Sequence, residues 1–588
     1  MIMNGLMVLI VLGIAYGLGA RGFYSALLTL ASVLVAGAVA FAVWEPLAIY
    51  LLDGLNIGFF NEAAWGLALV VPYAVTLGAL QAALSAVLRA NVNIKGPADL
   101  IGGLVCGLGS GIITAGVISI ALAGIRTPGD YMGHTPITYD KGGSLVRTAP
   151  LWVPVDKLVS RFYSQLSETT LRTNTPLAKW YPDLADRGHL IRIGPEGQTL
   201  RTVIRPTDVK VVGRYTVGQD TTIASNQLTT DSLDERIQKL RTIDGDDVGN
   251  GQYQIEGYVV QNFGGMREKG GQVVFGPGQL TLLCRDNDDT QSIALQPFAM
   301  ASQAQGDQLF IGRWRFDGEK VFLASVGGAA DPVMAFEFLM PKGYKPLALF
   351  IRGIRYPLAD DAGKTVDPFE KFASVADRDA AVRSRDLFES ASAVALDTGS
   401  ASVLNTRDSG GAGAEIRATN RLRANLMKGQ VGNLLLDDKN KIISGEALLR
   451  NDQLPERGAE RTLLVEQILV DNTVVIVQVD VGSTSSLAIT GAESEGDGAP
   501  ALFDENQQRY DAVGYFYKDA GLTRVRFTPD SPLKRSDLPS MSRSRTDQQL
   551  TLIFRCSLGV KITSYAIGTK VIRTLQPPLS LENSQAGR

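Results

Sequence analysis

The chain has 588 residues, and its 57 Lys and Arg side chains nearly balance 60 Asp and Glu, which leaves a net charge of −3. This length predicts several domains. The even charge, with no basic stripe, argues against nucleic acid as a partner. The only two histidines, His134 and His189, exclude histidine-rich metal sites and leave little room for acid–base catalysis by histidine.

The first quarter of the chain consists of four apolar stretches, at residues 1–20, 24–43, 63–88 and 100–124. Each is about 20 residues or longer, which is enough to cross a hydrocarbon layer of about 30 Å as a helix. None has a charged residue in its middle. The first is not typical of a signal peptide, because no Lys or Arg precedes its apolar run. We therefore expect a bundle of four transmembrane helices whose partner is the lipid bilayer.

The Lys and Arg residues in the loops between these stretches predict the orientation. The first and third loops carry Arg21, Arg89 and Lys95, whereas the second, residues 44–62, carries three acidic residues and no basic one. Because basic loops stay in the cytoplasm, we expect both chain termini on the outer side of the membrane.

The fourth stretch carries glycines four residues apart, Gly103, Gly107 and Gly111. This spacing places them on one helix face, where the missing side chains let another helix approach closely. We expect these three glycines to be helix-packing residues. The partner helix belongs either to the same chain or to a second copy.

Polar side chains within the apolar stretches are neutral, among them Gln81 and Thr114. Proton relays and ion pathways need ionisable groups at this depth. A pump or ion-coupled transporter is therefore disfavoured, and a scaffold or passive partner in a larger complex is favoured.

Residues 19–23, together with Asp99 and the glycine series that follows it, resemble the colicin V production proteins, a family of bacterial inner-membrane proteins with four helices. The resemblance covers residues 1–125, and Asn4-Gly5 stands where the family usually has an Asp. The positions that match the family motif are Arg21, Gly22, Phe23 and Asp99. The resemblance implies a multi-pass protein of the inner membrane, linked by the family name to toxin production or export. Combined with the loop charges, it implies a periplasmic C-terminal region.

Directly after the bundle, residues 151–171 have the apolar periodicity of a helix. One interpretation places this helix at the membrane interface, with Trp152 and Tyr163 among the headgroups. The other makes it a core helix of the next domain.

Two later regions contain short runs rich in β-branched and aromatic residues, separated by Gly, Asp and Asn, which is typical of strands. The expected strands are 253–260, 272–275, 279–284, 309–316, 320–324 and 334–339 in the first region, and 463–469, 473–481, 510–517, 522–527 and 550–554 in the second. We expect two immunoglobulin-like sandwich domains. Similar closing segments, 343–358 and 559–575, and an acidic turn in each set, 286–289 and 504–506, indicate that the two are copies.

The expected fold class is thus a four-helix membrane bundle joined to a mostly β soluble region. The expected segments are a transmembrane domain at 1–125, a connecting region with an amphipathic helix at 126–245, a first sandwich at 246–360, a helix, linker and strand–turn segment at 361–460, a second sandwich at 461–578 and a disordered tail at 579–588. Within the fourth segment we expect a helix at 368–388, a linker at 398–414 and a turn at 437–440.

Of the three cysteines, Cys106 lies in the fourth apolar stretch as a packing residue. Cys284 and Cys556 lie in expected strands. They are either a disulfide in an oxidising compartment or two separate buried thiols.

The sequence contains only weak signals for catalytic and metal sites. Residues 407–411 resemble the nucleophile loop of trypsin-like proteases, with Ser409 as nucleophile, but neither histidine has the surroundings of a triad base. The acidic runs 244–247 and 286–289 offer hard oxygen ligands for calcium, yet neither fits the twelve-residue calcium loop. We therefore predict no catalytic, cofactor-binding or metal-binding residue.

The function that follows is non-enzymatic. We expect an inner-membrane anchor or scaffold that presents a periplasmic binding module to other envelope proteins or to a second copy of itself. A membrane-tethered serine protease and a transporter or channel subunit are the alternatives.

Overall fold

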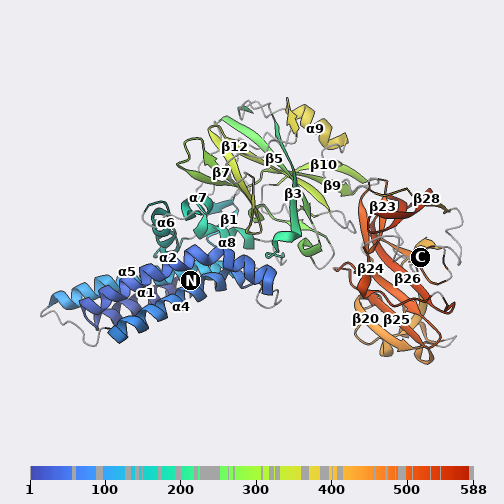
Figure 1. Ribbon diagram of the computed structural model, residues 1–588, viewed down its shortest axis with the longest axis horizontal. Coiled ribbons are helices and arrows are strands. Elements are labelled where there is room, and N and C mark those ends of the chain that lie inside the picture. The colour runs from blue at the N-terminus through green and yellow to red at the C-terminus, as the bar shows by residue number, and fades with distance from the viewer. Residues whose placement is uncertain are drawn as a thin grey trace.

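The structure is a computed structural model. It describes residues 2–581 except 56–60, 88–96, 126–133, 140–144, 149, 170–174, 194–199, 218–222, 225–251, 263, 269–271, 306–308, 317–322, 325–331, 359–369, 385–395, 400, 407–414, 456–458, 471–473, 484, 486, 488–497, 506, 530 and 543. Figure 1 shows an elongated helical bundle, a first β region over one end of it and a second β region beyond the first.

The bundle contains four helices that are long and apolar enough to cross a membrane, as predicted. They are α1 (Ile2–Gly19), α2 (Phe23–Ile49) continued by the π-helical η1 (Tyr50–Leu55), α4 (Ala64–Val87) and α5 (Pro97–Gly124). Apolar residues on every face make such helices stable only inside lipid or protein.

The predicted second loop, residues 44–62, is wrong over most of its length. The helix that begins at Phe23 continues through η1, so it has 33 residues and extends about 50 Å at 1.5 Å per residue. Trp44, Glu45 and Asp53 are therefore helical. Such a helix is longer than a hydrocarbon layer of about 30 Å is thick.

Three short helices connect the bundle to the β regions. They are α6 (Val155–Glu168), α7 (Leu177–Trp180) and α8 (Leu184–Arg192), accompanied by the paired strands β1 (Ile137–Tyr139) and β2 (Leu145–Arg147). The helix expected at residues 151–171 is confirmed with narrower bounds, whereas α7 and α8 are too short for their periodicity to be recognised.

The first β region consists of two main sheets. One has the order β10-β9-β12-β5-β3-β15, with β4 beside β5, and the other has the order β14-β13-β7-β8. Their strands are β3 (Val209–Val217), β4 (Ile223–Ala224), β5 (Gln252–Asn262), β7 (Leu280–Asp286), β8 (Ser292–Leu295), β9 (Ala299–Gln305), β10 (Leu309–Arg315), β12 (Val333–Pro341), β13 (Tyr344–Ile351), β14 (Ile354–Pro357) and β15 (Glu370–Phe372). A separate pair is formed by β6 (Val274–Phe275) and β11 (Leu323–Ala324). Tyr258 and Phe336 of the first sheet share a buried core with Leu282 and Leu349 of the second.

The second β region is an eleven-stranded sheet that turns back on itself, together with the pair β18-β21. Its strands are β16 (Ser402–Asn405), β17 (Ile416–Ala418), β18 (Arg421–Met427), β19 (Leu435–Leu436), β20 (Ile442–Arg450), β21 (Leu464–Gln467), β22 (Val474–Asp480), β23 (Pro500–Asp504), β24 (Arg509–Lys518), β25 (Leu522–Phe527), β26 (Gln549–Ser557), β27 (Lys561–Ile567) and β28 (Lys570–Ser580). Because β17 pairs with β22 and β20 with β25, this region begins well before residue 461.

The two β regions repeat one strand order. The first contains β3-β5-β12-β9-β10 and β14-β13-β7-β8, and the second contains β17-β22-β26-β24-β25 and β28-β27-β23-β24. In the second copy the long strand β24 belongs to both layers, and its register shifts between Ala512 and Gly514.

The acidic turn is also repeated. Asp286 accepts hydrogen bonds from the backbone N–H groups of Thr290 and Gln291, and Asp504 accepts one from Gln508. One residue in each turn has a positive φ, 58° at Asp289 and 57° at Gln507. The aspartates thus hold equivalent β-turns together.

A buried ion pair holds a helix against the outer face of the first sheet. The predicted helix at 368–388 is wrong in part, because its beginning forms β15 and the described helix is α9 (Val375–Ser384). Arg378 of α9 donates to both carboxylate oxygens of Glu337 on β12 at 2.8 Å, and neither side chain is exposed. The Tyr215 hydroxyl also donates to Glu337, at 2.9 Å.

Three further expectations about the β regions are settled by the fold. Cys284 and Cys556 are separate buried thiols, so the disulfide alternative is wrong. The tail expected to be disordered from residue 579 is partly ordered, because β28 ends at Ser580 and Leu581 is buried; residues 582–588 lie outside the described part. The expected turn at 437–440 is confirmed, with Asp437 accepting hydrogen bonds from the N–H groups of Lys439 and Lys441.

Candidate functional site: the junction of the helices and the first β region

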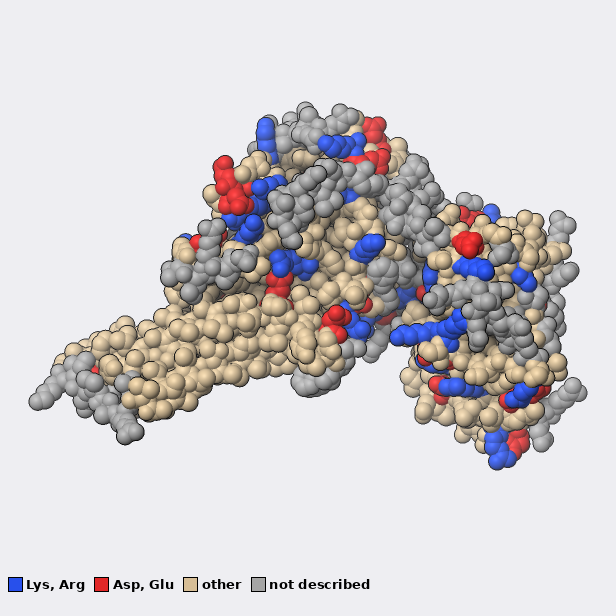
Figure 2. All heavy atoms as spheres, in the orientation of Figure 1, with Lys and Arg blue, Asp and Glu red and all other residues tan. Residues whose placement is uncertain are grey.

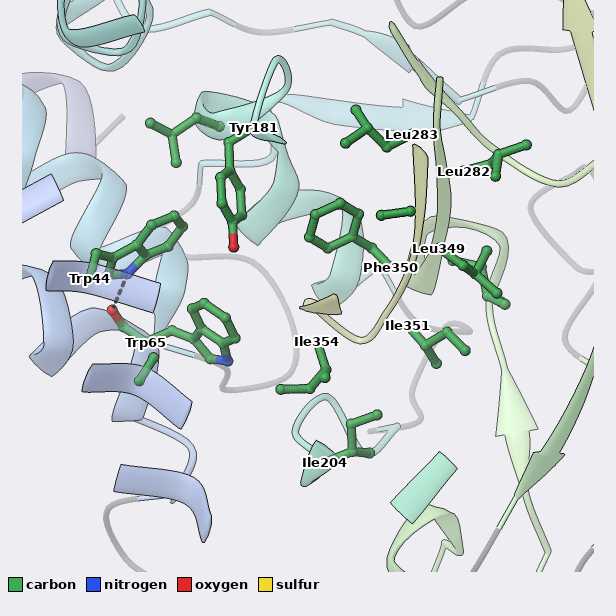
Figure 3. Close-up of a cluster of buried hydrophobic side chains, with 14 of the residues drawn as sticks. Trp44, Trp65, Tyr181, Ile204, Leu282, Leu283, Leu349, Phe350, Ile351 and Ile354 are labelled. Carbon is green, nitrogen blue, oxygen red and sulfur yellow. Dashed lines mark hydrogen bonds between the residues drawn. The ribbon is translucent and has the colours of Figure 1, made fainter. Parts of the chain in front are cut away.

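The helical bundle and the first β region share one continuous apolar core. Buried side chains of α2, α4 and α5 belong to the same cluster as those of β7 and β13, with α6 and α7 between them. Figure 3 shows this junction, where Trp44 and Trp65 from the helices face Tyr181, Phe350 and Ile354. Separating the two parts would expose the apolar surface at their contact to water, at a cost of about 25 cal/mol per Å².

Aromatic rings form a chain across the junction. The Trp44 indole donates to the Trp65 carbonyl oxygen at 2.9 Å, and the ring centroids lie 5.3 Å apart. Tyr181, just after α7, lies 5.1 Å from Trp44 and 5.5 Å from Phe350 of β13. Such tilted aromatic pairs add about 0.5–1.5 kcal/mol each beyond burial.

An ion pair joins the two parts beside the rings. Arg355 of β14 makes a two-pronged contact with Glu45 of α2, at 2.7 and 2.9 Å, and its guanidinium lies 4.3 Å from the Trp180 ring centroid. The paired donor geometry of Arg fixes orientation as well as distance. The interaction fixes the rotation of the first β region relative to α2.

A second arginine fills the space between α8 and β13. The Arg187 guanidinium lies 3.7 Å from the Phe350 ring centroid and 4.7 Å from that of Tyr181, and it pairs with Asp183 at 2.5 Å. Burial, together with the nearby Glu45 carboxylate, raises the pKa of Tyr181 well above its usual value. The phenol is therefore neutral, and the junction contains no catalytic base from this residue.

Small residues in the bundle let the connecting helices approach closely. The Tyr163 hydroxyl of α6 donates to the Leu34 carbonyl oxygen at 3.1 Å, and a Cβ on Gly37 would lie 2.0 Å from that hydroxyl oxygen. A Cβ on Gly116 of α5 would lie 2.5 Å from the Val155 carbonyl oxygen. Glycines at these two positions thus leave the space on the bundle surface that α6 occupies.

The only two histidines of the chain meet beside this junction. The ring centroids of His134 and His189 lie 5.6 Å apart at nearly a right angle. Burial, and then the charges of Arg192 and His134, lower the pKa of His189 to about 3, and burial lowers that of His134. Nearby, Arg147 of β2 pairs with Asp186 of α8.

We expect the protein to lose stability as the pH falls from about 6.5. His189 stays neutral in the folded state but takes up a proton in the unfolded chain, so the folded state loses about 1.4 kcal/mol per pH unit below the unfolded pKa. Between pH 6.5 and 5 the loss is about 2 kcal/mol. Thermal unfolding of the detergent-solubilised protein at both pH values measures it. The H189Q variant should lose markedly less over this interval; an equal loss would contradict the assignment to His189.

The predicted glycine series lies against α1 of the same chain, which resolves the alternatives of a partner in the same chain or in a second copy. A Cβ on Gly103 would lie 3.1 Å from the Cα of Gly19, and one on Gly107 would lie 2.8 Å from the Cα of Ala15. Gly111 is equally close to the Val11 backbone. This close backbone approach is how small residues pack membrane helices.

Three of the four motif residues meet at the turn between α1 and α2. The Asp99 carboxylate accepts a hydrogen bond from the Phe23 N–H at 2.7 Å. Gly22 has φ +89°, and a Cβ there would lie 2.7 Å from an Asp99 oxygen. Arg21 lies exposed in the same turn. Asp99 thus caps the N-terminus of α2 while lying in the first turn of α5.

Replacing Asp99 by Asn should destabilise the bundle by about 1 kcal/mol, because a charge-assisted cap on α2 becomes a neutral one. Thermal unfolding in detergent would show a lower midpoint. The matched control is D53N, since Asp53 is exposed at the other end of α2. Equal midpoints for D99N and wild type would argue against the capping role.

The described residues add no support for the alternative protease, calcium or passage sites. Ser409 and residues 244–247 lie outside the described residues. Within the described part, no group of three potential metal ligands from His, Cys, Asp and Glu is found. Thr114, considered as a lining residue of a passage, shares a 2.7 Å hydrogen bond with the Tyr73 hydroxyl between α4 and α5.

Comparisons with known proteins give no relative. No protein family matches the chain, and no curated protein does. Among solved structures, the crystal structure of vicilin from Corylus avellana (hazelnut) is 9% identical, covers 52% of this chain and 83% of that chain, and has a TM-score of 0.08. This score shows no common fold.

The junction is not predictable from the sequence. The sequence places Glu45 in a loop and Arg355 in a closing segment of the first β region. The available signal was a carboxylate between Trp44 and Pro46 within an apolar run, since an acidic residue there needs a partner. Nothing in the sequence names that partner 310 positions away.

Proposed function

We propose that this protein is a membrane-anchored scaffold in which the four helices lie in a bilayer and hold the first β region in a fixed orientation. The observation that carries the proposal is the continuous core between bundle and β region, together with the Glu45–Arg355 pair. A passive tether needs no such core, because a flexible linker is enough to keep a domain at a membrane.

Both β regions fit immunoglobulin-like domains in this proposal. In such domains the first, second, fifth and fourth strands form one sheet, and the third, sixth and seventh form the other. The orders β3-β5-β12-β9 and β14-β13-β7 follow this pattern, and β17-β22-β26-β24 and β28-β27-β23 repeat it. Two stacked sandwiches suit a protein that presents binding surfaces at a distance from the membrane.

The resemblance of residues 1–125 to colicin V production proteins remains part of the proposal. The contact of Gly22 and Phe23 with Asp99 supports it, since these residues match the family motif and act together. In this view the bundle belongs to a bacterial inner membrane, the β regions lie in the periplasm, and the partners are other envelope proteins.

The proposal is tested by fractionating cells that express the full-length protein. Washing membranes at alkaline pH releases peripheral proteins but leaves inserted helices in the pellet, so the protein should remain there until detergent is added. Crosslinking in the same membranes should then capture envelope proteins or a second copy. Recovery of a folded, monodisperse protein in the detergent-free supernatant would overturn the anchor.

The predicted side of the membrane needs a separate measurement. Fusing a reporter that is active only in the periplasm to the C-terminus should give a signal. A signal from a cytoplasm-specific reporter instead would reverse the orientation while leaving the anchor intact.

A further inference from the structure

Helix α6 has one face buried in the protein and another that is exposed and partly apolar. Val155, Val159 and Tyr163 are buried against the bundle. Along the edge of this face, Leu158 is 47% exposed and Phe162 37%, and Trp152, just before the helix, is 67% exposed. Three large apolar side chains together on one short segment are unusual for a surface that faces water.

The contacts of α6 fix its level along the bundle. The backbone N–H of Trp152 donates to the Asn4 side-chain oxygen at 2.8 Å, and Leu151 packs with Met3 and Met7 of α1. Val155 and Val159 lie against Gly116 of α5. Helix α6 therefore crosses the bundle beside the first turns of α1.

This level lies about one hydrocarbon thickness from the opposite end of the bundle. From Asp99, in the first turn of α5, the helix rises 17 residues to Gly116, which is about 26 Å at 1.5 Å per residue. A hydrocarbon layer is about 30 Å thick. In Figure 1, α6 lies at the edge of the region where the connecting helices cover the bundle, and in Figure 2 the uncovered part of the bundle is mostly tan on the face shown.

The part of the bundle between Asp99 and the level of Gly116 also carries exposed apolar residues on all four helices. Those more than about a third exposed include Leu9 and Leu12 of α1, Val35 and Val39 of α2, Val71 and Val75 of α4, and Leu100 and Val105 of α5. Beyond this layer, Trp44 and Trp65 are buried by protein. On the side of the bundle that the connecting helices and the first β region cover, the boundary between lipid-facing and protein-facing surface therefore lies at α6; Tyr50 and Leu55 of η1, farther along, remain exposed.

We infer that α6 lies in the outer interfacial layer of the phospholipid bilayer, with Trp152, Leu158 and Phe162 inserted among the upper acyl chains. Arg161, exposed on the same face, reaches the lipid phosphates with its charged end while its stem covers apolar surface. The outer turns of α2 and α4 then stand above the bilayer, where the soluble part covers Trp44 and Trp65. This inference rests on the proposed membrane anchor.

The test places an environment-sensitive fluorophore on single cysteines of the full-length protein in phosphatidylcholine–phosphatidylglycerol vesicles. The three native cysteines are buried, and unmodified protein serves as the labelling blank. The variants are L158C and F162C on α6, L12C on α1 as the lipid control and L448C on β20 as the water control, because Leu12 and Leu448 are both exposed.

We expect L158C and F162C to emit at the shorter wavelengths of L12C and to be quenched by lipids that carry a nitroxide near the headgroup. L12C should instead be quenched best by a nitroxide deeper in the acyl chain, and L448C by neither. If the α6 labels behave like L448C, the interfacial assignment fails and the anchor stands. If L12C also behaves like L448C, the anchor itself fails.

One more result of the same experiment would show that protein, and not lipid, covers the exposed face of α6. Labels that are shielded from water but not quenched by nitroxide lipids would mean that protein, from a second copy or another partner, covers this face. That result would overturn the lipid assignment.

Discussion

Replacing Trp44 by Ala is expected to destabilise the protein by about 3–5 kcal/mol, the usual cost of removing a buried Trp side chain. The indole contacts both Trp65 and Tyr181 and donates a buried hydrogen bond. Its removal opens a cavity between bundle and β region and leaves the Trp65 carbonyl oxygen without this donor. Hydrogen exchange of the solubilised protein should show faster exchange in β13 and β14, the strands that carry Phe350 and Arg355.

The matched control for W44A is W152A, because Trp152 is largely exposed. In detergent this change should lower stability by less than about 1 kcal/mol, as surface substitutions usually do. The second β region provides an internal reference, since its cores form separate clusters. Faster exchange in β22 and β26 to the same extent as in β13 would mean that the effect of W44A is not specific to the junction.

The change R378M should cost about 3–5 kcal/mol, because it removes the Arg378 cation from the buried Glu337 carboxylate. Both side chains are inaccessible to solvent, and the hydrogen bond from the neutral Tyr215 hydroxyl does not supply the positive charge that Arg378 brings to Glu337. We expect α9 to detach from the sheet and the first β region to unfold at lower denaturant concentration. The midpoint of chemical unfolding measures this loss.

Two further variants make this prediction specific. In R378M/E337Q the buried charge is gone while an acceptor for Tyr215 remains, so most of the stability should return. R450M removes an arginine from the exposed pair with Asp452, and such pairs contribute about 0–1 kcal/mol. Equal losses for R378M and R450M, or no recovery in the double variant, would contradict the role given to the buried pair.

The parts of the fold that were predictable are those in which local sequence determines the structure. Uninterrupted apolar runs gave the four helices, and alternation between turn residues and β-branched residues gave most of the strands. The repeat was visible because its turns need particular residues, such as Asp286 and Asp504. Gly103, Gly107 and Gly111 were recognised because glycine at a spacing of four has few other uses in an apolar helix.

The parts that were missed depend on partners far away in the chain. Glu45 and Pro46 resemble the end of a helix, yet α2 continues because Arg355 neutralises Glu45 and the first β region buries the surrounding apolar surface. Helix α9 is defined by its ion pair with Glu337 rather than by apolar periodicity. For the helix at 151–171 the sequence allows both an interfacial and a core role. The buried Tyr163 side chain fits the core role, and the exposed Trp152 side chain fits the interfacial role.

The sheet β14-β13-β7-β8 and its counterpart β28-β27-β23-β24 each have one face that packs against other parts of the chain, and these parts differ between the two copies. In the first, Phe350 and Arg285 on this face contact the connecting helices. In the second, Ala501 and Phe503 on the equivalent face pack with Leu396 and Ala401, a segment of the same region that leads into β16. We therefore expect the C-terminal copy to fold when it is produced alone, whereas cutting the N-terminal copy from its helices would expose the apolar face that they cover.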